Sequence, residues 1–280
     1  MALSRTQVAQ YRAQGFLSGL PIFRPADCER FRASAARFEA EHPADREWAF
    51  DIKCNLLFDW VYANATHPAL LECVADLLGG DLLLTNSVFR IKEPGSGTRY
   101  GWHQDSARIR VEPAPAIVYV AISEATVENG CLAVIPGTHD HVRPFDLVEN
   151  PGQPRRRVAR VRDVDPRAAV YLQLRPGEVA IFDANVIHGS APNRSAARRF
   201  AVLHDYTAAS ARQSTGRGSG QLVRGVDPHG HFAPEPPPSA DFEANVRVRR
   251  RILTAYPENI LMGPLAPGAA PDFPDRPPGR

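Results

Sequence analysis

The sequence predicts a mainly β protein, a sandwich or barrel of short strands with helices at its N-terminal end. β-Branched and aromatic residues recur in short runs between Gly and Pro turns from Leu82 onward, and helical periodicity comes before them. A chain of 280 residues, 44% of them hydrophobic, can form a substantial core. We expect a single domain, 1–280, with a helical part at about 4–80, a β core at about 81–207 and a C-terminal extension at about 208–280.

The helical part carries three local helix signals. Ser4 and Gln7 form a capping box, and Gly15 should end the helix that follows it. A second helix is expected over 25–42, where apolar residues recur at helical spacing. A third is expected over 68–78, ended by a Gly-Gly pair. The apolar face of the second helix consists of Cys28, Phe31, Ala35 and Phe38.

The β core is expected to contain six strands separated by turns. The Glu-Asn-Gly sequence at 128–130 is a hairpin signal that should join strand 116–123 to a return strand 131–135. The expected strands are 82–92, 116–123, 131–135, 170–174, 178–182 and 198–206.

Three other segments carry weaker signals. Residues 136–168 are interpreted as a long polar insertion, in which the arginine run 155–157 is a solvated loop. Beyond residue 210 Gly and Pro dominate, with a last helix at 247–256 and a loose tail at 264–280.

His103 and Asp105 are the first candidate metal ligands. Residues i and i+2 of a strand point to the same face, so an imidazole and a carboxylate would converge there. His188 lies far along the chain and can join them only if a second strand runs alongside. Two imidazoles and one carboxylate are the ligand set of non-haem Fe(II) oxygenases, and they leave the opposite face of the ion open. An H-x-D triplet alone is common and often lies in a surface turn.

Arg199 supplies the context for that triplet. It lies in the segment 198–203, which otherwise has the pattern of a buried strand, and a buried charge needs a partner. A guanidinium suits a small carboxylate, so the triad and this arginine together predict iron with a bound keto acid. Strand alternation turns only one of two neighbours inward, which makes Arg198 the competing candidate.

Several segments in order resemble the phytanoyl-CoA dioxygenase family of Fe(II)/2-oxoglutarate-dependent oxygenases. The resemblance spans roughly residues 4–207 and implies a double-stranded β-helix core, a relative of the jelly roll and cupin folds, with 2-oxoglutarate and O2 as co-substrates. The matching segments are 89–97, 102–105 (Trp-His-Gln-Asp), 128–132, 135–139, 176–178, 188–190 (His-Gly-Ser) and 198–199.

The resemblance also assigns the site residues. The family's metal ligands fall on His103, Asp105 and His188, and relatives that halogenate carry a small residue in place of Asp105, so oxygenation is favoured. The spacing from His188 selects Arg199 as the clamp for the distal carboxylate of 2-oxoglutarate. Tyr119 could instead pack in the core, and the Asn86 amide could lie at a strand edge. The further 2-oxoglutarate contacts implied are Ser190, Asn86 and Tyr119.

Three arginines are candidate substrate contacts. Arg108 and Arg110 follow the H-x-D triplet, and Arg224 lies in a later segment. They suggest an acidic substrate, such as a phosphonate, carboxylate or phosphate. The alternative is that all three face solvent.

The remaining histidines are interpreted as structural. His139 and His141, and likewise His229 and His231, have ligand-like spacing but lie in predicted loops. His204, on the last predicted strand, should be a core histidine with satisfied hydrogen bonds.

Composition excludes several classes of protein. A net charge of +2 is too small for a nucleic-acid binder, and no apolar run is long enough for a signal peptide or a membrane span. We expect a cytoplasmic protein with a small-molecule substrate and no nucleic-acid or membrane partner; oligomeric state is not readable. Four scattered cysteines without a C-x-x-C pair indicate reduced thiols: Cys28, Cys54, Cys73 and Cys131.

The sequence therefore predicts an Fe(II)- and 2-oxoglutarate-dependent dioxygenase. It should hydroxylate an unactivated C–H bond of a small metabolite and release succinate and CO2. Desaturation, epoxidation and cyclisation use the same cofactors and stay open. A non-catalytic metal-binding sensor is the alternative from another class, and O2 uptake separates it from an enzyme.

Overall fold

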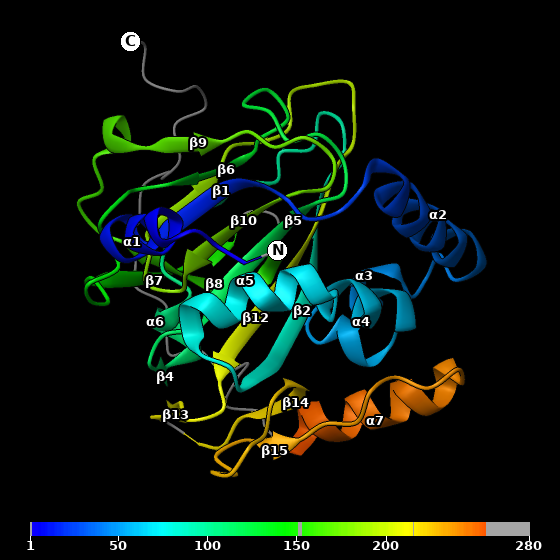
Figure 1. The fold of residues 1–280 in the computed structure, drawn as a ribbon. Helices are drawn as coiled ribbons and strands as arrows, with labels where there is room; N and C mark the ends of the chain where they lie inside the picture. Colours follow the sequence, from blue (N-terminus) through cyan, green and yellow to red (C-terminus); the bar gives the residue numbers. More distant parts are fainter. Residues whose placement is uncertain (1, 151–152, 215, 256–280) are drawn as a thin grey trace.

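The computed structural model describes residues 2–150, 153–214 and 216–255, and Figure 1 shows a β core with helices beside it. The helices are α1 Arg5–Gln14, α2 Pro25–Glu41, α3 Arg46–Ala49, η1 Cys54–Leu56, α4 Asp59–Ala65, α5 Pro68–Leu78, α6 Ser106–Ile109, η2 Pro166–Ala168 and α7 Phe242–Ala255. The strands are β1 Phe16–Pro21, β2 Leu82–Lys92, β3 Tyr100–His103, β4 Val111–Glu112, β5 Ala116–Ala121, β6 Leu132–Val134, β7 Phe145–Asn150, β8 Gln153–Val161, β9 Val170–Leu172, β10 Glu178–Asp183, β11 His188–Ser190, β12 Arg199–Ala208, β13 Arg212–Gln213, β14 Ser219–Arg224 and β15 Ala233–Pro234.

Two sheets form the core of the described part of the chain. The larger sheet has the strand order β1-β10-β5-β12-β2-β14-β15, and the smaller has the order β3-β11-β6-β9. Neighbouring strands in both are antiparallel, apart from the parallel pair β14 and β15. Two further strand pairs, β7 with β8 and β4 with β13, lie outside these sheets.

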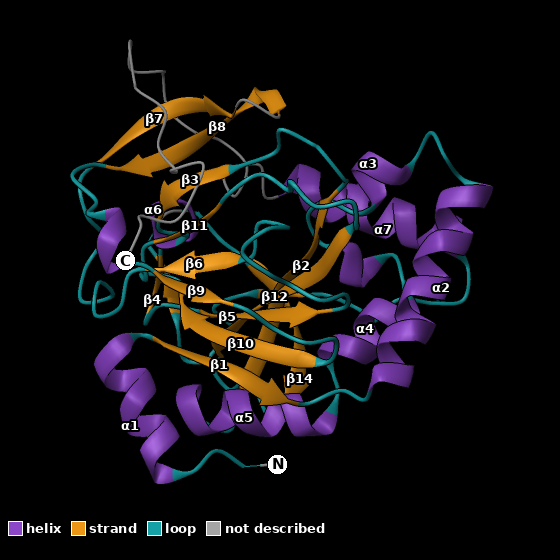
Figure 2. Ribbon diagram, turned by 90° about the horizontal axis from the view of Figure 1, so that it is seen from above, coloured by secondary structure: helices purple, strands orange, loops and turns teal. Residues whose placement is uncertain are grey.

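β12 lies in the middle of the larger sheet and is buried along its whole length. Phe200 and Val202 point to one face, where they join the hydrophobic cluster formed with helices α2, α4 and α5. Ala201 and Leu203 point to the other face and pack with residues of the smaller sheet. The larger sheet therefore separates a helical layer from an interior shared by the two sheets, as Figure 2 shows from above. This arrangement agrees with the expected double-stranded β-helix.

The three predicted N-terminal helices are confirmed as α1, α2 and α5. The capping box of α1 is complete, because Ser4 Oγ accepts from Gln7 N at 3.2 Å and Gln7 Oε1 accepts from Ser4 N at 2.8 Å. Gly15 ends α1 with a φ of 81°, a left-handed conformation that favours glycine. The predicted apolar face of α2 is the face that the structure buries.

The predicted hairpin around residues 128–130 is wrong. β5 pairs with β10 and β12 in the larger sheet, whereas β6 pairs with β9 and β11 in the smaller one. The turn therefore carries the chain from one sheet to the other. Its glycine is required: Gly130 has a φ of 75°, and a Cβ there would lie 2.2 Å from Ala191 O. The local turn signal is real, but it does not determine which strands pair.

The insertion and the C-terminal extension contain more structure than expected. Residues 136–168 include the paired strands β7 and β8, and the arginine run 155–157 lies within β8, not in a loop. β14 extends the larger sheet beside β2, and α7 begins at Phe242, earlier than predicted. The predicted tail 264–280 lies outside the described residues. Strands β1, β3 and β11 were missed because they are short or interrupted by Gly and Pro, so no period develops.

Two expectations about the chain as a whole can be compared with the structure. Within the described residues, no helix combines the length and the apolarity that crossing a membrane requires. All four cysteines are buried and none is in a disulfide, as their scattered positions indicated.

Candidate active site

The predicted triad converges where the chain leaves β3 and enters β11. His103 ends β3 and His188 begins β11, and the two residues are direct cross-strand neighbours. Asp105 lies between their rings: its Oδ1 is 3.6 Å from His103 Nε2 and its Oδ2 is 3.6 Å from His188 Nε2. One ligand atom of each residue falls within 4.8 Å of the others, a group that could hold one metal ion.

The convergence has a different local origin from the one expected. Asp105 is not on a strand: it is the N-cap residue of α6, with φ −66° and ψ −32° in the right-handed helical region. The turn at the end of β3, not strand alternation, brings the carboxylate beside the His103 ring. The spacing of two residues correctly predicted that the two side chains meet. The expected reason, strand alternation, does not apply to Asp105.

The two imidazoles are oriented as metal ligands require. His103 Nδ1 lies 2.7 Å from Gly101 O, and His188 Nδ1 lies 3.0 Å from Val186 O. A carbonyl can only accept, so each Nδ1 carries the proton and each Nε2 presents a lone pair toward Asp105. Two neutral nitrogens and a carboxylate oxygen are a donor set that suits Fe(II), so the residues fit the metal that the family resemblance implies.

Electrostatics also favours the neutral ligand form of His103. Burial, together with the adjacent His188, lowers its pKa to about 4 against the opposing effect of Asp105. The ring is therefore deprotonated at Nε2 near neutral pH without having to release a proton to a metal.

Gln104 holds the triad segment in place from the opposite side. It is fully buried, and its amide donates to His141 O at 2.9 Å and to Thr138 O at 3.3 Å. Its Oε1 accepts from Arg143 N at 2.7 Å. The residue between the two ligands thus anchors the segment to the 138–143 turn, which is the structural role of that turn.

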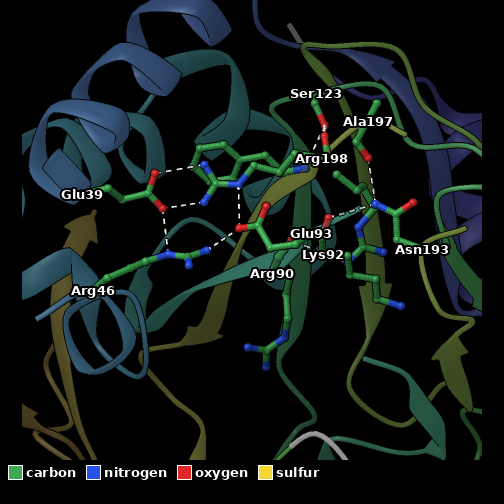
Figure 3. A network of polar contacts seen from close by, with 11 residues as sticks. Glu39, Arg46, Arg90, Lys92, Glu93, Ser123, Asn193, Ala197 and Arg198 are labelled. Atoms are coloured by element: carbon green, nitrogen blue, oxygen red, sulfur yellow. Dashed lines mark hydrogen bonds and ion pairs between the residues drawn. The ribbon is translucent and has the colours of Figure 1, made fainter. Parts of the chain in front are cut away.

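The competition between Arg198 and Arg199 has a clear geometric outcome. Arg198 points to the helical side, where it pairs with Glu39 at 3.0 Å and with Glu93 at 3.1 Å, and Arg46 completes the cluster (Figure 3). Arg199 points to the interior and is only 2% exposed. It donates to Gly130 O and forms no ion pair within the described residues. Arg199 is therefore the arginine that remains available to bind a carboxylate.

Lys92 is a functional candidate that the sequence analysis missed. It pairs with Arg199 across the β2–β12 ladder and is completely buried. Its Nζ donates to Ser190 Oγ at 2.7 Å and to Ala191 O, and no carboxylate pairs with it in the described part of the chain. Burial lowers its pKa from 10.5 to about 5, and the charge of Arg199 adds to this effect. The sequence signal that could have identified Lys92 is a lysine within a strand that is otherwise mostly apolar.

Ser190 and Tyr119 join the same group, and Asn86 does not. The Arg199 guanidinium lies 5.9 Å from the centre of the Tyr119 ring, and the buried Tyr119 hydroxyl has no hydrogen-bond partner in the structure. Asn86 pairs with Asp205 farther along the ladder, six residues from Lys92, or about 20 Å along an extended strand. One keto acid therefore cannot contact both positions through its distal carboxylate.

Two of the three predicted substrate arginines, Arg110 and Arg224, have exposed side chains. Arg110 is exposed at the end of α6, where it has a φ of 49° and its carbonyl accepts from Ser214 N. Arg224 is exposed at the sheet edge opposite Leu82. The Arg108 backbone lies in α6, but its side chain is outside the described part of the structure. Neither described side chain supports the acidic-substrate interpretation.

The other histidines lie apart from the triad, and within the described residues only the triad forms a group of three potential ligands. His139 contacts Arg12 O at 3.1 Å, and His231 contacts Ala211 O at 3.1 Å. His204 is fully buried, with Ser87 Oγ at 2.8 Å and Asn64 Oδ1 at 2.9 Å. The prediction of a satisfied core histidine at 204 is confirmed.

Comparisons with known proteins agree with this site. The sequence model described as phytanoyl-CoA dioxygenase (PhyH) matches residues 11–201, which contain the triad and Arg199. A probable phytanoyl-CoA dioxygenase from Caenorhabditis elegans is 30% identical over 158 residues, covering 52% of this chain and 50% of that protein. The chain thus spans about half the length of the curated relatives it matches.

Two solved structures extend the likeness to the fold. The non-heme monooxygenase ThoJ in its apo form has a TM-score of 0.80 at 28% identity, covering 91% of this chain and 97% of ThoJ. CytC3 with Fe(II) and alpha-ketoglutarate has a TM-score of 0.63 at 21% identity, covering 83% and 93% of the two chains. These likenesses confirm the predicted double-stranded β-helix with flanking helices.

Proposed function

The chain belongs to the phytanoyl-CoA dioxygenase (PhyH) family of Fe(II)/2-oxoglutarate-dependent oxygenases, and we propose that it hydroxylates an unactivated C–H bond of a small metabolite. One observation carries the proposal. A triad with two available Nε2 atoms stands beside two buried basic side chains, Arg199 and Lys92, that have no acidic partner among the described residues. The metal ligands and the anion-binding group are therefore present together in one interior.

The role of the triad is to bind the metal ion and to fix its position. His103, Asp105 and His188 would hold Fe(II) from one side, which leaves the other side of the ion for the keto acid and O2. When bound, the iron and 2-oxoglutarate supply the oxidant, as the keto acid is converted to succinate and CO2 with O2. The carbonyl contacts on both Nδ1 atoms fix the ring planes, and Gln104 fixes the connecting turn.

Arg199 and Lys92 would hold the distal carboxylate of 2-oxoglutarate. Arg199 lies in a buried, low-dielectric position where a charge-assisted hydrogen bond is strong. Lys92 lies beside it with Ser190, and the unpartnered Tyr119 hydroxyl completes the set of donors. Binding an anion here gives Arg199 the opposite charge that the described residues do not supply, and it favours the protonated form of Lys92.

Retention of Asp105 supports oxygenation over halogenation. A carboxylate ligand occupies the position that a halide would need on the metal. Desaturation, epoxidation and cyclisation use the same residues, and no described contact favours one of them over hydroxylation.

The test is an anaerobic titration of the purified protein with Fe(II) and then 2-oxoglutarate. We expect a visible charge-transfer band after the second addition, which reports chelation of the keto acid by the iron. The His188→Ala variant should bind Fe(II) at least about tenfold more weakly and lose turnover. A folded, iron-loaded protein without the band would refute the oxygenase proposal, and an iron-dependent sensor would then be the better account.

A further inference from the structure

Asp205 is a buried carboxylate on the same face of β12 as Arg199. Only 9% of its surface is exposed, and its partner across the ladder is Asn86. Six residues separate Asp205 from Arg199, about 20 Å along the strand. Across the sheet Asp205 neighbours Ile117, which pairs with Phe182, and the Phe182 ring lies 4.8 Å from the His188 ring, so Asp205 lies in the part of the interior near the triad.

A relay of backbone and amide contacts holds the Asp205 carboxylate in position. Asn86 Nδ2 donates to Asp205 Oδ2 at 2.9 Å, and Asn86 Oδ1 accepts from Lys53 N at 2.7 Å. The backbone contact leaves the amide only one useful orientation, with its NH2 toward the carboxylate. Among the described residues, Asn86 is the only side chain that forms a hydrogen bond with the Asp205 carboxylate.

The two cations whose charge acts on Asp205, Lys53 and Arg90, are engaged elsewhere. Lys53 Nζ pairs with Glu235 at 2.6 Å and donates to Thr85 O at 2.6 Å. The Arg90 guanidinium lies over the Tyr100 ring, 5.4 Å from its centre. Figure 3 shows the Arg90 side chain pointing away from the Arg198 cluster, on the interior side of β2. Neither cation forms an ion pair with Asp205 in the described part of the chain.

A buried carboxylate without a counter-charge is costly to maintain. Burial raises the pKa of Asp205 to about 7, with a further increase from Asp105 and opposing effects from Asn86, Arg90 and Lys53. A positively charged ligand would offset this cost, and an anionic ligand would increase it.

We propose that Asp205, positioned by Asn86, binds a positively charged group of the substrate, such as a protonated amine, a guanidinium or an imidazolium. This inference rests on the proposed function, because it places the substrate on the side of the triad opposite Arg199. It replaces the acidic substrate expected from the sequence with a basic one. Two positions six residues apart on the β2–β12 ladder then bind opposite charges, the keto acid near Lys92 and the substrate cation near Asn86.

The experiment uses the full chain loaded anaerobically with Fe(II) and 2-oxoglutarate. The probes are the chlorides of guanidinium, n-propylammonium and imidazolium, with methylphosphonate as an anion and NaCl as an ionic-strength control. Binding is followed by calorimetry and by the shift of the charge-transfer band. We expect at least one cation to bind saturably with 1:1 stoichiometry. Its Kd should weaken at least about tenfold in Asp205→Asn and in Asp205→Ser.

Ser87→Ala is the matched control. It removes a buried hydrogen bond to His204, one ladder position from Asp205 but on the helical face, so cation binding should be unchanged. Equal cation affinity in wild type and Asp205→Asn would overturn the inference, as would saturable binding of methylphosphonate alone or of no probe. Absence of the charge-transfer band in the wild type would instead refute the proposed function, while calorimetry still tests the cation site.

Discussion

Arg198 and Arg199 are adjacent in sequence, yet they lie in opposite electrostatic environments. Arg198 is 30% exposed and belongs to a cluster in which two arginines meet two glutamates, Glu39 and Glu93 (Figure 3). Arg199 is 2% exposed and lies beside a second basic side chain, Lys92, and neither forms an ion pair with an acid among the described residues. One face of the strand has balanced charges, whereas the other has an uncompensated positive charge.

This difference distinguishes an arginine that stabilises the fold, Arg198, from one that is available to bind a ligand, Arg199. A balanced cluster between α2, α3 and the strand ends stabilises the packing of helices on the sheet and needs nothing further. A buried arginine without an acid, beside a lysine whose pKa is lowered to about 5, is unfavourable in the free protein and becomes favourable when an anion binds. Burial alone does not identify the functional arginine; burial without a partner does.

The largest predicted effect is the difference in 2-oxoglutarate affinity between two single variants, Arg199→Met on the interior face and Arg198→Met on the helical face. Arg199→Met should weaken 2-oxoglutarate binding by at least about 50-fold, because truncating a buried charge partner costs about 2–5 kcal/mol. Fe(II) binding should persist. The measurement is the 2-oxoglutarate dependence of the charge-transfer band.

Arg198→Met is the control for that variant, and its 2-oxoglutarate affinity should equal that of the wild type. If both variants lose the same affinity, the distinction between the two faces fails.

An intermediate effect is expected at Lys92. The folded pKa of about 5 lies below the usual 10.5, so between these values the unfolded chain holds a proton that the folded chain lacks. The contribution of Lys92 to the free energy of unfolding therefore rises with pH from about 5 to 10.5, by up to about 1.4 kcal/mol per pH unit. Lys92→Met should remove that slope and stabilise the 2-oxoglutarate-free protein near pH 7 by about 2 kcal/mol.

The measurement is urea unfolding at several pH values, with wild type and Lys92→Met compared at each. The same variant should bind 2-oxoglutarate more weakly, so stability and affinity move in opposite directions. A variant that is less stable at every pH would show that Lys92 is a structural residue.

The smallest effect is expected in the balanced cluster. Glu39→Gln removes a carboxylate that contacts both Arg46 and Arg198, but these side chains are 36% and 30% exposed. The loss of stability should be below about 1 kcal/mol and should shrink in high salt. Urea unfolding at two salt concentrations tests this. A large drop in 2-oxoglutarate affinity would instead reveal coupling between the two faces.

Local signals predicted the elements that local forces form. The capping box at Ser4, the glycine that ends α1 and the apolar face of α2 are written within a few residues, and the structure reproduces them. The pairing of β5 and β6 was predicted wrongly, because a turn sequence specifies chain reversal and not the partner strand. Strand pairing depends on which faces are buried, which only the assembled sheets establish.

The candidate site shows the same division. The identities of His103, Asp105, His188 and Arg199 and their spacing were legible in the sequence, and the family resemblance selected Arg199 over Arg198. The separation of Asn86 from the Arg199 group was not legible, since it depends on position along a ladder of strands from distant segments.

The sequence by itself determined the ligand chemistry, the family and the local helices, because these depend on residue type and short spacing. Only the tertiary structure decided which arginine lacks an acidic partner among the described residues, that Lys92 joins it, and that Asp205 lies buried without an ion pair in that part of the chain. The physical reason is that a charge's partners come from strands and helices far apart in the chain. Whether a charge is balanced or left for a ligand is therefore a property of the packed protein.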